Sequence, residues 1–145
     1  MWSWRRLSST DADFELAKQI RKAVFVVEQG VDAQKEYDSF EAEAQHYLVL
    51  NGSDPIATAR WRKTSDGVKL ERFAVLAAYR GKGVGHFLVK LVLNDALKQG
   101  KPIYLNAQVQ VVDFYQKLDF LKEGDLFEEA GIQHFRMFFK AAQPS

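Results

Sequence analysis

Three glycines alternate with two cations in the segment Arg80-Gly81-Lys82-Gly83-Val84-Gly85. Because glycine has no side chain, a ligand can approach the main-chain N–H groups of such a segment closely. The apolar run Phe87–Leu97 follows, and its spacing predicts a helix that begins at about Val84. The unpaired N–H groups and the positive dipole end of that helix lie at the same point. The segment is therefore typical of a phosphate or pyrophosphate site, and an ordinary surface turn is the alternative.

Two well-known nucleotide-binding loops do not match this segment. Counted from Gly81, the dinucleotide fingerprint needs a glycine at the sixth position, where His86 stands. The nucleoside-triphosphate loop needs Ser or Thr after Gly-Lys, where Gly83 stands. A different kind of nucleotide-binding protein stays as a third hypothesis, and stabilisation by ATP but not by coenzyme A would favour it.

The composition bounds the class of protein. A chain of 145 residues with 47% hydrophobic residues is long enough for one domain with a real core. Its 20 basic and 19 acidic residues argue against a nucleic-acid or membrane partner. The absence of cysteine excludes disulfides, thiolate metal sites and a cysteine nucleophile, and it fits a reducing compartment. Neither a membrane-spanning run nor a signal-peptide core is visible. We expect a cytoplasmic protein with one domain over residues 1–140 and a loose tail over 141–145.

Hydrophobic periodicity places the glycine segment inside an alternating order of strands and helices. Strands are expected over residues 2–7, 46–50, 56–62, 68–75, 103–107, from 120 onwards, and over 132–139. Helices are expected over residues 14–29, 84–99 and 109–118, and the acidic stretch 32–43 reads as a surface loop with room for one helical turn. The early strands form an antiparallel meander. The strands on either side of the glycine segment are expected to be parallel neighbours joined by a right-handed crossover.

The strand, glycine segment and helix together resemble motif A of the GNAT superfamily of acetyl-CoA-dependent N-acetyltransferases. Leu105-Asn106-Ala107 and the run Val112–Phe120 resemble its motif B, although Asp119 stands where the family commonly has glycine. The runs Arg21–Val31 and Glu129–His134 resemble the small ElaA-type branch. This resemblance covers nearly the whole chain. It implies an α+β GNAT fold, with a mixed sheet of about seven strands and about four helices.

The resemblance also implies a function. The chain would transfer the acetyl group of acetyl-CoA to a primary amine, by direct attack through a tetrahedral intermediate. A coenzyme A-binding sensor or scaffold without turnover is the alternative. The acceptor stays open between a small-molecule amine and a protein amine, and the protein would be a monomer or homodimer. We expect no metal, because no ligand-spaced cluster is visible.

Three residues are candidates for the chemical steps. Tyr115 stands at the family's tyrosine position and would protonate the leaving thiolate, unless it is only a packed aromatic. The main-chain N–H of Val75 would stabilise the oxyanion. Glu71 is expected on the same strand face as Val75, where it would act as a base through water. Glu28 and Asp38 are rivals, and an ordinary ion pair is the alternative for each acid.

The resemblance further implies which residues contact the two substrates. Coenzyme contacts are expected from Phe73, Ala74, Val75, Arg80, Gly81, Lys82, Gly83, Val84, Gly85, Asn106, Asp113, Tyr115 and Lys117. Acceptor contacts are expected from Glu28, Asp38, His46, Arg72 and His134. Hydrogen-bonded, half-buried histidines are the equal alternative for His46 and His134. Arg60, Arg62 and Arg72 would bind the 3′-phosphate or an acceptor carboxylate, or else form cross-strand ion pairs with Glu71.

Overall fold

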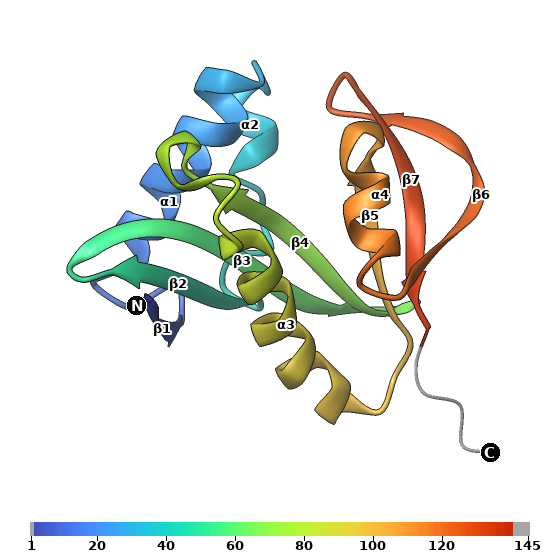
Figure 1. The fold of residues 1–145 in the computed structure, drawn as a ribbon, viewed down its shortest axis with the longest axis horizontal. Coiled ribbons are helices and arrows are strands. Elements are labelled where there is room, and N and C mark those ends of the chain that lie inside the picture. Colours follow the sequence, from blue (N-terminus) through green and yellow to red (C-terminus); the bar gives the residue numbers. More distant parts are fainter. Residues whose placement is uncertain (1, 141–145) are drawn as a thin grey trace.

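One mixed sheet runs through the computed structural model, which describes residues 2–140 (Figure 1). Its seven strands lie in the order β1-β2-β3-β4-β5-β7-β6. They are β1 (Trp2–Leu7), β2 (Gln45–Asn51), β3 (Asp54–Thr64), β4 (Gly67–Val75), β5 (Ile103–Gln108), β6 (Phe120–Glu129) and β7 (Ile132–Phe139). Every neighbouring pair is antiparallel except β4 and β5, which are parallel. The expected mixed sheet and its parallel pair are confirmed, and the expected tail 141–145 lies outside the described residues.

Helices cover both faces of the sheet. α1 (Phe14–Arg21) continues as π-helical turns over Lys22–Glu28 and is followed by α2 (Ala33–Glu36). On the other face lie α3 (Val84–Ala96) and α4 (Val112–Gln116), the latter entered through a 3₁₀ turn, Val109–Val111. The short helix expected over 109–118 is therefore a 3₁₀ turn followed by an α-helix. Within the described residues, no helix is long and apolar enough to cross a membrane.

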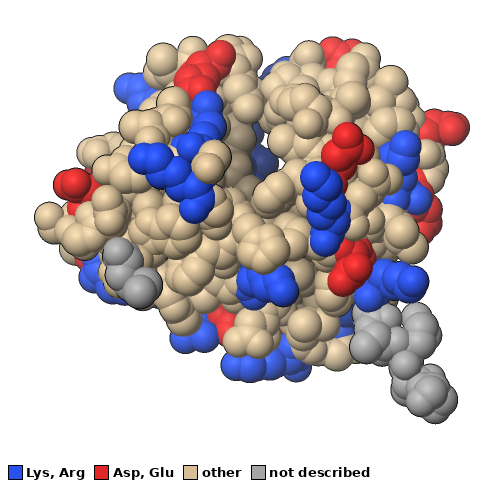
Figure 2. Space-filling view, in the orientation of Figure 1, with Lys and Arg blue, Asp and Glu red and all other residues tan. Residues whose placement is uncertain are grey.

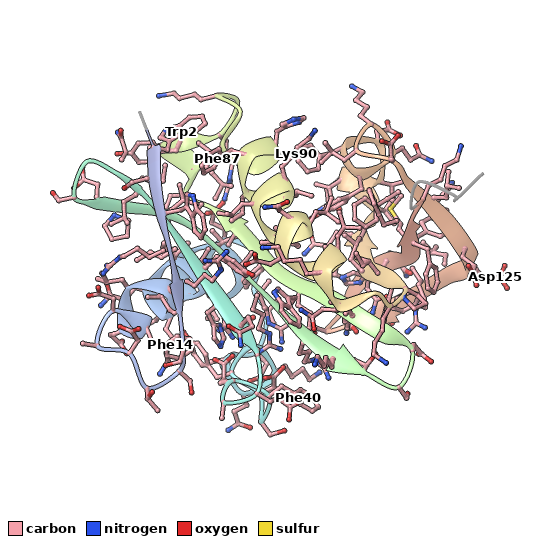
Figure 3. All side chains as sticks on the ribbon, turned by 90° about the horizontal axis from the view of Figure 1, so that it is seen from below. Trp2, Phe14, Phe40, Phe87, Lys90 and Asp125 are labelled. Atoms are coloured by element: carbon pink, nitrogen blue, oxygen red, sulfur yellow. The ribbon has the colours of Figure 1, made fainter. Side chains whose placement is uncertain are left out.

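Two apolar clusters hold these layers together. The larger one joins α3 and α4 to the sheet, and its helix residues include Val84, Leu88 and Val92. The smaller one packs the apolar stripe of α1 and the π-helical turns after it, from Phe14 to Val24, against β2 and β4. Trp2 of β1 meets Phe87 of α3 edge-on, with ring centroids 5.6 Å apart (Figure 3). The spacing of apolar residues in both helices thus predicts correctly which sides are buried.

The sheet opens at the end of β4. Arg60 of β3 lies opposite Glu71, whereas Thr58 lies opposite Ala74, so β4 carries one extra residue there. Arg72 takes up this bulge with a φ of 59°. On the other side, β4 pairs with β5 only over three residues, ending at Leu70 and Leu105. The two strands therefore separate beyond that point.

The bulge overturns one expectation from the sequence. Leu70 and Phe73 both belong to the cluster on the α3 side, although they are three positions apart. Without a bulge, residues three apart would lie on opposite faces. Glu71 thus faces the α1–α2 side of the sheet. The prediction that it shares a face with Phe73 and Val75 is wrong.

Candidate active site

A deep cleft of about 890 Å³ lies at the opening between β4 and β5. The end of the Lys22–Glu28 turns, α2 and the glycine segment line one side, and β5, α4 and the β6–β7 hairpin line the other. Figure 2 shows the hollow between these two halves, with blue Lys or Arg atoms at its depth. Because residues from both ends of the chain line it, the cleft exists only in the folded protein.

The glycine segment reaches this cleft with unpaired main-chain donors. Gly81 and Gly83 have φ angles of 75° and 88°, which favour glycine. Gly83 is the N-cap residue of α3, and no side chain caps that helix. The first hydrogen bond of the helix joins Phe87 N–H to the Gly83 carbonyl, at 3.1 Å. The preceding N–H groups have no partner within the helix, which is what a diphosphate requires.

The end of β4 presents its main chain to the cleft. Leu76 N–H donates to the Ile56 carbonyl of β3 at 2.9 Å. Since successive residues of a strand point to opposite sides, the N–H and C=O of Val75 point to the open edge. The Val75 carbonyl accepts a hydrogen bond from Arg80 Nε at 2.9 Å. The orientation agrees with the role expected for the Val75 N–H.

Arg80 is held in place by Glu28 at the end of the π-helical turns. Both terminal nitrogens of Arg80 donate to the Glu28 carboxylate at 2.8 Å. These hydrogen bonds lower the pKa of the Glu28 carboxyl. Glu28 and Arg80 therefore bridge the cleft mouth, beside a second bridge from Gln108 to Gln29 at 2.8 Å.

Tyr115 lies on α4 among aromatic rings and lines the cleft. Its ring meets Phe73 at 6.2 Å and Phe120 at 5.7 Å. Burial alone raises the pKa of its hydroxyl, so the phenol keeps its proton at neutral pH. Across the opening, the Asn106 side-chain oxygen is buried without a hydrogen-bond partner and lines the same cleft. A buried carbonyl of this kind is suited to an amide N–H of a ligand.

A network of buried ion pairs forms the α1–α2 side of the cleft. Arg60 is fully buried and contacts Asp38, Glu41 and Glu71. Arg21, also buried, contacts Glu36 and Glu41. Burial raises the pKa of the Asp38 carboxyl, but the hydrogen bonds and charge of Arg60 outweigh it and lower that pKa to about 2. Burial raises the pKa of the Glu36 carboxyl, and the charges of Arg21 and Arg72 only partly offset it. Each of these acids is already paired with a cation.

Glu71 is surrounded by cations. Its carboxylate accepts from Arg60 at 3.2 Å and from Arg62 at 2.7 Å, and Lys69 lies 3.2 Å away. Burial raises its pKa, but the three positive charges together lower it below its ordinary value. A carboxylate with a lowered pKa is a weak base. The cross-strand ion pair, which was the alternative for Glu71, Arg60 and Arg62, is confirmed.

The two histidines have different surroundings. His134 of β7 lines the cleft, with Nδ1 2.7 Å from the Ile132 carbonyl and its ring stacked on Phe127 at 5.8 Å. His46 of β2 is buried against Phe14, and its Nε2 lies 2.9 Å from the Glu41 carbonyl. Burial lowers the pKa of His46. His46 does not line the cleft, so its expected contact with the acceptor is not supported, because α1 covers its side of β2.

A family model described as an acetyltransferase (GNAT) domain matches residues 12–141 of this chain. The chain belongs to the GNAT acetyltransferase family. It is 37% identical over 134 residues to a Bacillus subtilis protein named as the uncharacterized N-acetyltransferase YjcF, covering 90% of this chain and 95% of that protein. The crystal structure of Escherichia coli ElaA superposes with a TM-score of 0.85 at 31% identity, covering 97% of this chain and 100% of that chain. The GNAT fold and the resemblance to the ElaA-type branch are confirmed.

A more distant structural neighbour was solved with coenzyme A bound. PaiA N-acetyltransferase from Thermoplasma acidophilum, solved in complex with coenzyme A, superposes with a TM-score of 0.69 at 18% identity, covering 97% of this chain and 99% of that chain. At this identity the likeness concerns the fold alone. In residues 2–140, no cluster of three or more His, Asp or Glu side chains is placed to hold a metal ion.

Most residues that the GNAT resemblance suggested do line the cleft. They are Glu28, Asp38, Glu71, Arg72, Phe73, Ala74, Val75, Arg80, Gly81, Gly83, Gly85, Asn106, Tyr115 and His134. Four expected coenzyme contacts have side chains elsewhere. Lys82, Asp113 and Lys117 are exposed outside the cleft, and the Val84 side chain is buried in the core. For Val84, only its main-chain N–H can take part.

Several residues that line the cleft were not among those expected from the sequence, and two of them matter for its chemistry. Lys69 of β4 and Phe40 of the loop before β2 both belong to the cleft wall. Lys69 is two positions before Glu71, so the alternation of a strand was a usable signal that it shares a face with that acid. Nothing in the sequence indicated Phe40, because it sits in an aperiodic loop.

Proposed function

We propose that this protein transfers the acetyl group of acetyl-CoA to a primary amine. The observation that carries the proposal is the position of the uncapped N-terminus of α3 beside the open edge of β4. The N-terminus of α3 supplies N–H donors for a diphosphate. The open edge of β4 supplies main-chain groups, and its separation from β5 leaves a gap for the extended pantetheine arm. The unpartnered oxygen of Asn106 supports this fit, because a pantetheine arm carries amide N–H groups.

Acetyl-CoA would supply an acyl group activated as a thioester. The N–H groups of the segment Arg80–Gly85 would bind its diphosphate. Arg80 would then release the Val75 carbonyl and Glu28 and donate its hydrogen bonds to the bound anion instead. The main-chain edge of Phe73 and Val75 would pair with the pantetheine amides. All these groups are held by α3 and β4, so the site is preorganised.

The chemical steps need three further functions. The Val75 N–H would donate to the oxyanion that develops as the amine nitrogen bonds to the acyl carbon. The carbon–sulfur bond then breaks, and the Tyr115 hydroxyl would donate to the departing thiolate. The amine must also lose a proton. We assign the acceptance of this proton to His134 Nε2. His134 Nδ1 lies 2.7 Å from the Ile132 carbonyl, so the ring hydrogen sits on Nδ1 and Nε2 keeps its lone pair. Glu129 lies 3.9 Å from Nε2.

A thermal-shift and thiol-release experiment tests the proposal. Binding to the folded state at 100 times Kd stabilises a protein by about 2.7 kcal/mol. For a chain of this size that raises Tm by about 5–10 °C. We expect acetyl-CoA to give such a shift, and free coenzyme A to appear when a suitable amine is added. Stabilisation without release for any amine of a broad panel would favour a sensor, and stabilisation by ATP alone would overturn coenzyme binding.

A further inference from the structure

We propose that the amine acceptor carries a carboxylate, and that Arg62 and Lys69 bind this second group. This inference rests on the function proposed above and specifies its substrate class. Arg62 of β3 and Lys69 of β4 are directly opposite each other in the register of the two strands. Both line the cleft, and each side chain is 14% exposed. The Glu71 carboxylate lies between them, 2.7 Å from Arg62 and 3.2 Å from Lys69, but it also contacts Arg60, so one acid serves three cations.

Both cations keep unused hydrogen-bond donors. Arg62 uses Nε to donate to Glu71, and its guanidinium carbon lies over the Phe40 ring, 3.8 Å from the centroid. Among the described residues, neither terminal nitrogen of Arg62 has a hydrogen-bond partner. The Lys69 ammonium has one ion-pair contact, with Glu71. Since a guanidinium has five N–H donors and an ammonium three, most of their capacity is free to bind a ligand.

The acids in the same part of the cleft have no such capacity. Glu71 is held by three cations. Asp38 is held by Arg60 and Arg72, and Glu36 by Arg21 and Arg72. The deep end of the cleft therefore offers donors and no free carboxylate. It suits an anion and disfavours a second ammonium group, such as that of a polyamine.

The charge of the network points to a single carboxylate. Its connected ion pairs join five cations to four carboxylates, which leaves one positive charge unmatched. The cations are Arg21, Arg60, Arg62, Lys69 and Arg72, and the acids are Glu36, Asp38, Glu41 and Glu71. The planar guanidinium of Arg62 also matches a carboxylate with two parallel hydrogen bonds. A phosphate would bring more negative charge than this network can balance.

The reacting amine would lie at the other end of the cleft. Glu129, in the β6–β7 hairpin, lines the cleft near His134 and is 46% exposed, and within the described residues no Lys or Arg contacts it. Lys69 lies opposite Tyr104 of β5, and His134 lies opposite Gln108, four residues further along the same strand, or about 13 Å. The carboxylate and the amine of the acceptor are therefore separated by several carbon atoms, as in an ω-amino acid or the side chain of lysine.

Matched pairs of amines test this inference. Thiol release from acetyl-CoA is measured with 5-aminopentanoate against pentylamine, and with L-lysine against 1,5-diaminopentane. We expect kcat/KM to be about 100-fold higher for the member with a carboxylate, as one charged hydrogen-bonded contact gives about this ratio. Equal or higher values for the members without it overturn the inference. An amine bearing a phosphate ester that exceeds both acids overturns the assignment to a carboxylate.

Variants then locate the contact. The double substitution Arg62→Gln with Lys69→Gln should abolish the preference, mainly by raising KM, while acetyl-CoA still raises Tm. Lys63→Gln is the matched control, since Lys63 lies next to Arg62 on β3 but does not line the cleft. A preference that survives the double substitution overturns the role of these residues. If no amine releases thiol, the proposed function itself fails. If amines without a carboxylate react best, only the present inference fails.

Discussion

Removing the hydroxyl of Tyr115 is the sharpest test of the proposed chemistry. Tyr115→Phe keeps the ring, and burial is the one cause of the raised pKa of this phenol, so no internal hydrogen bond is lost. The side chain is 7% exposed and packs on Phe73, Phe114 and Phe120. We therefore expect the free energy of unfolding to change by less than about 1 kcal/mol.

The size of the catalytic effect follows from the two pKa values. General acids contribute about 10²- to 10⁴-fold to a rate. A thiol has a pKa of about 8.5, whereas the Tyr115 phenol is raised above the ordinary value of about 10, so complete proton transfer to the thiolate is uphill. The hydrogen bond to the thiolate is then the main contribution, and the lower end of the range applies. We expect kcat to fall about 100-fold, or about 2.7 kcal/mol in the barrier.

Steady-state thiol release over pH 6–9 measures this effect. The raised pKa keeps Tyr115 protonated over this range, so it should add no high-pH loss of activity to the wild-type profile. Tyr104→Phe is the control, because its hydroxyl bonds Thr64 at 2.7 Å and does not line the cleft. It should lower stability by about 1 kcal/mol and leave kcat unchanged. If Tyr115→Phe retains kcat within about threefold, Tyr115 is only a packed aromatic and the reasoning from its pKa is refuted.

Four further outcomes are expected. His134→Gln should lower kcat by about 10²-fold with a small change in Tm, and an unchanged rate would remove it as the base. Arg60→Met leaves Asp38, Glu41 and Glu71 without their shared cation and should cost about 3–5 kcal/mol in urea unfolding. The pKa values of Asp38 and Asp95 are lowered to about 2, the latter by hydrogen bonds from Arg6 and Tyr47 that outweigh burial. Their contribution to the free energy of unfolding, about 2 kcal/mol each at most, is present above pH 4 and lost as pH falls towards 2. Between pH 7 and pH 3, the free energy of unfolding of Asp95→Asn should therefore change less than that of wild type. Asp119 has a φ of 70°, which glycine adopts with less strain, so Asp119→Gly should raise the free energy of unfolding by about 0.5 kcal/mol. A fall in Tm would show that the Asp119 side chain stabilises the turn by more than the backbone strain costs.

The sequence predicted features that depend on neighbours along the chain. The strand, glycine segment and helix from Val68 to Ala96 appear as expected, because apolar spacing and glycine conformations are local properties. The same holds for the turn at Asp119, where the resemblance indicated a glycine position and the backbone has a positive φ. Local rules were enough for the cofactor side of the cleft.

Features that depend on distant neighbours were not predictable in this way. The face of Glu71 was wrong because a bulge at Arg72 leaves no mark in the alternation of residue types. His46 was placed in the cleft because nothing in β2 shows that Phe14 of α1 covers it. Lys69 was overlooked because a lysine in a strand ordinarily faces solvent, whereas here it is 14% exposed. The acceptor side of the cleft is built from such long-range contacts.

The bulge at Arg72 has a consequence for how this sheet tolerates changes of length. One added residue reverses the alternation of β4, so Leu70 and Phe73 pack on the same layer while the strand turns away from β5. Deleting Arg72 would place Leu70 and Phe73 two positions apart, so both would still pack on the α3 side. The bend that the extra residue introduces would be lost, and β4 could continue beside β5. The packing layers of β4 therefore survive this deletion, whereas the opening between β4 and β5 does not. The number of residues in β4, more than the identity of any one side chain, keeps the gap between β4 and β5 open.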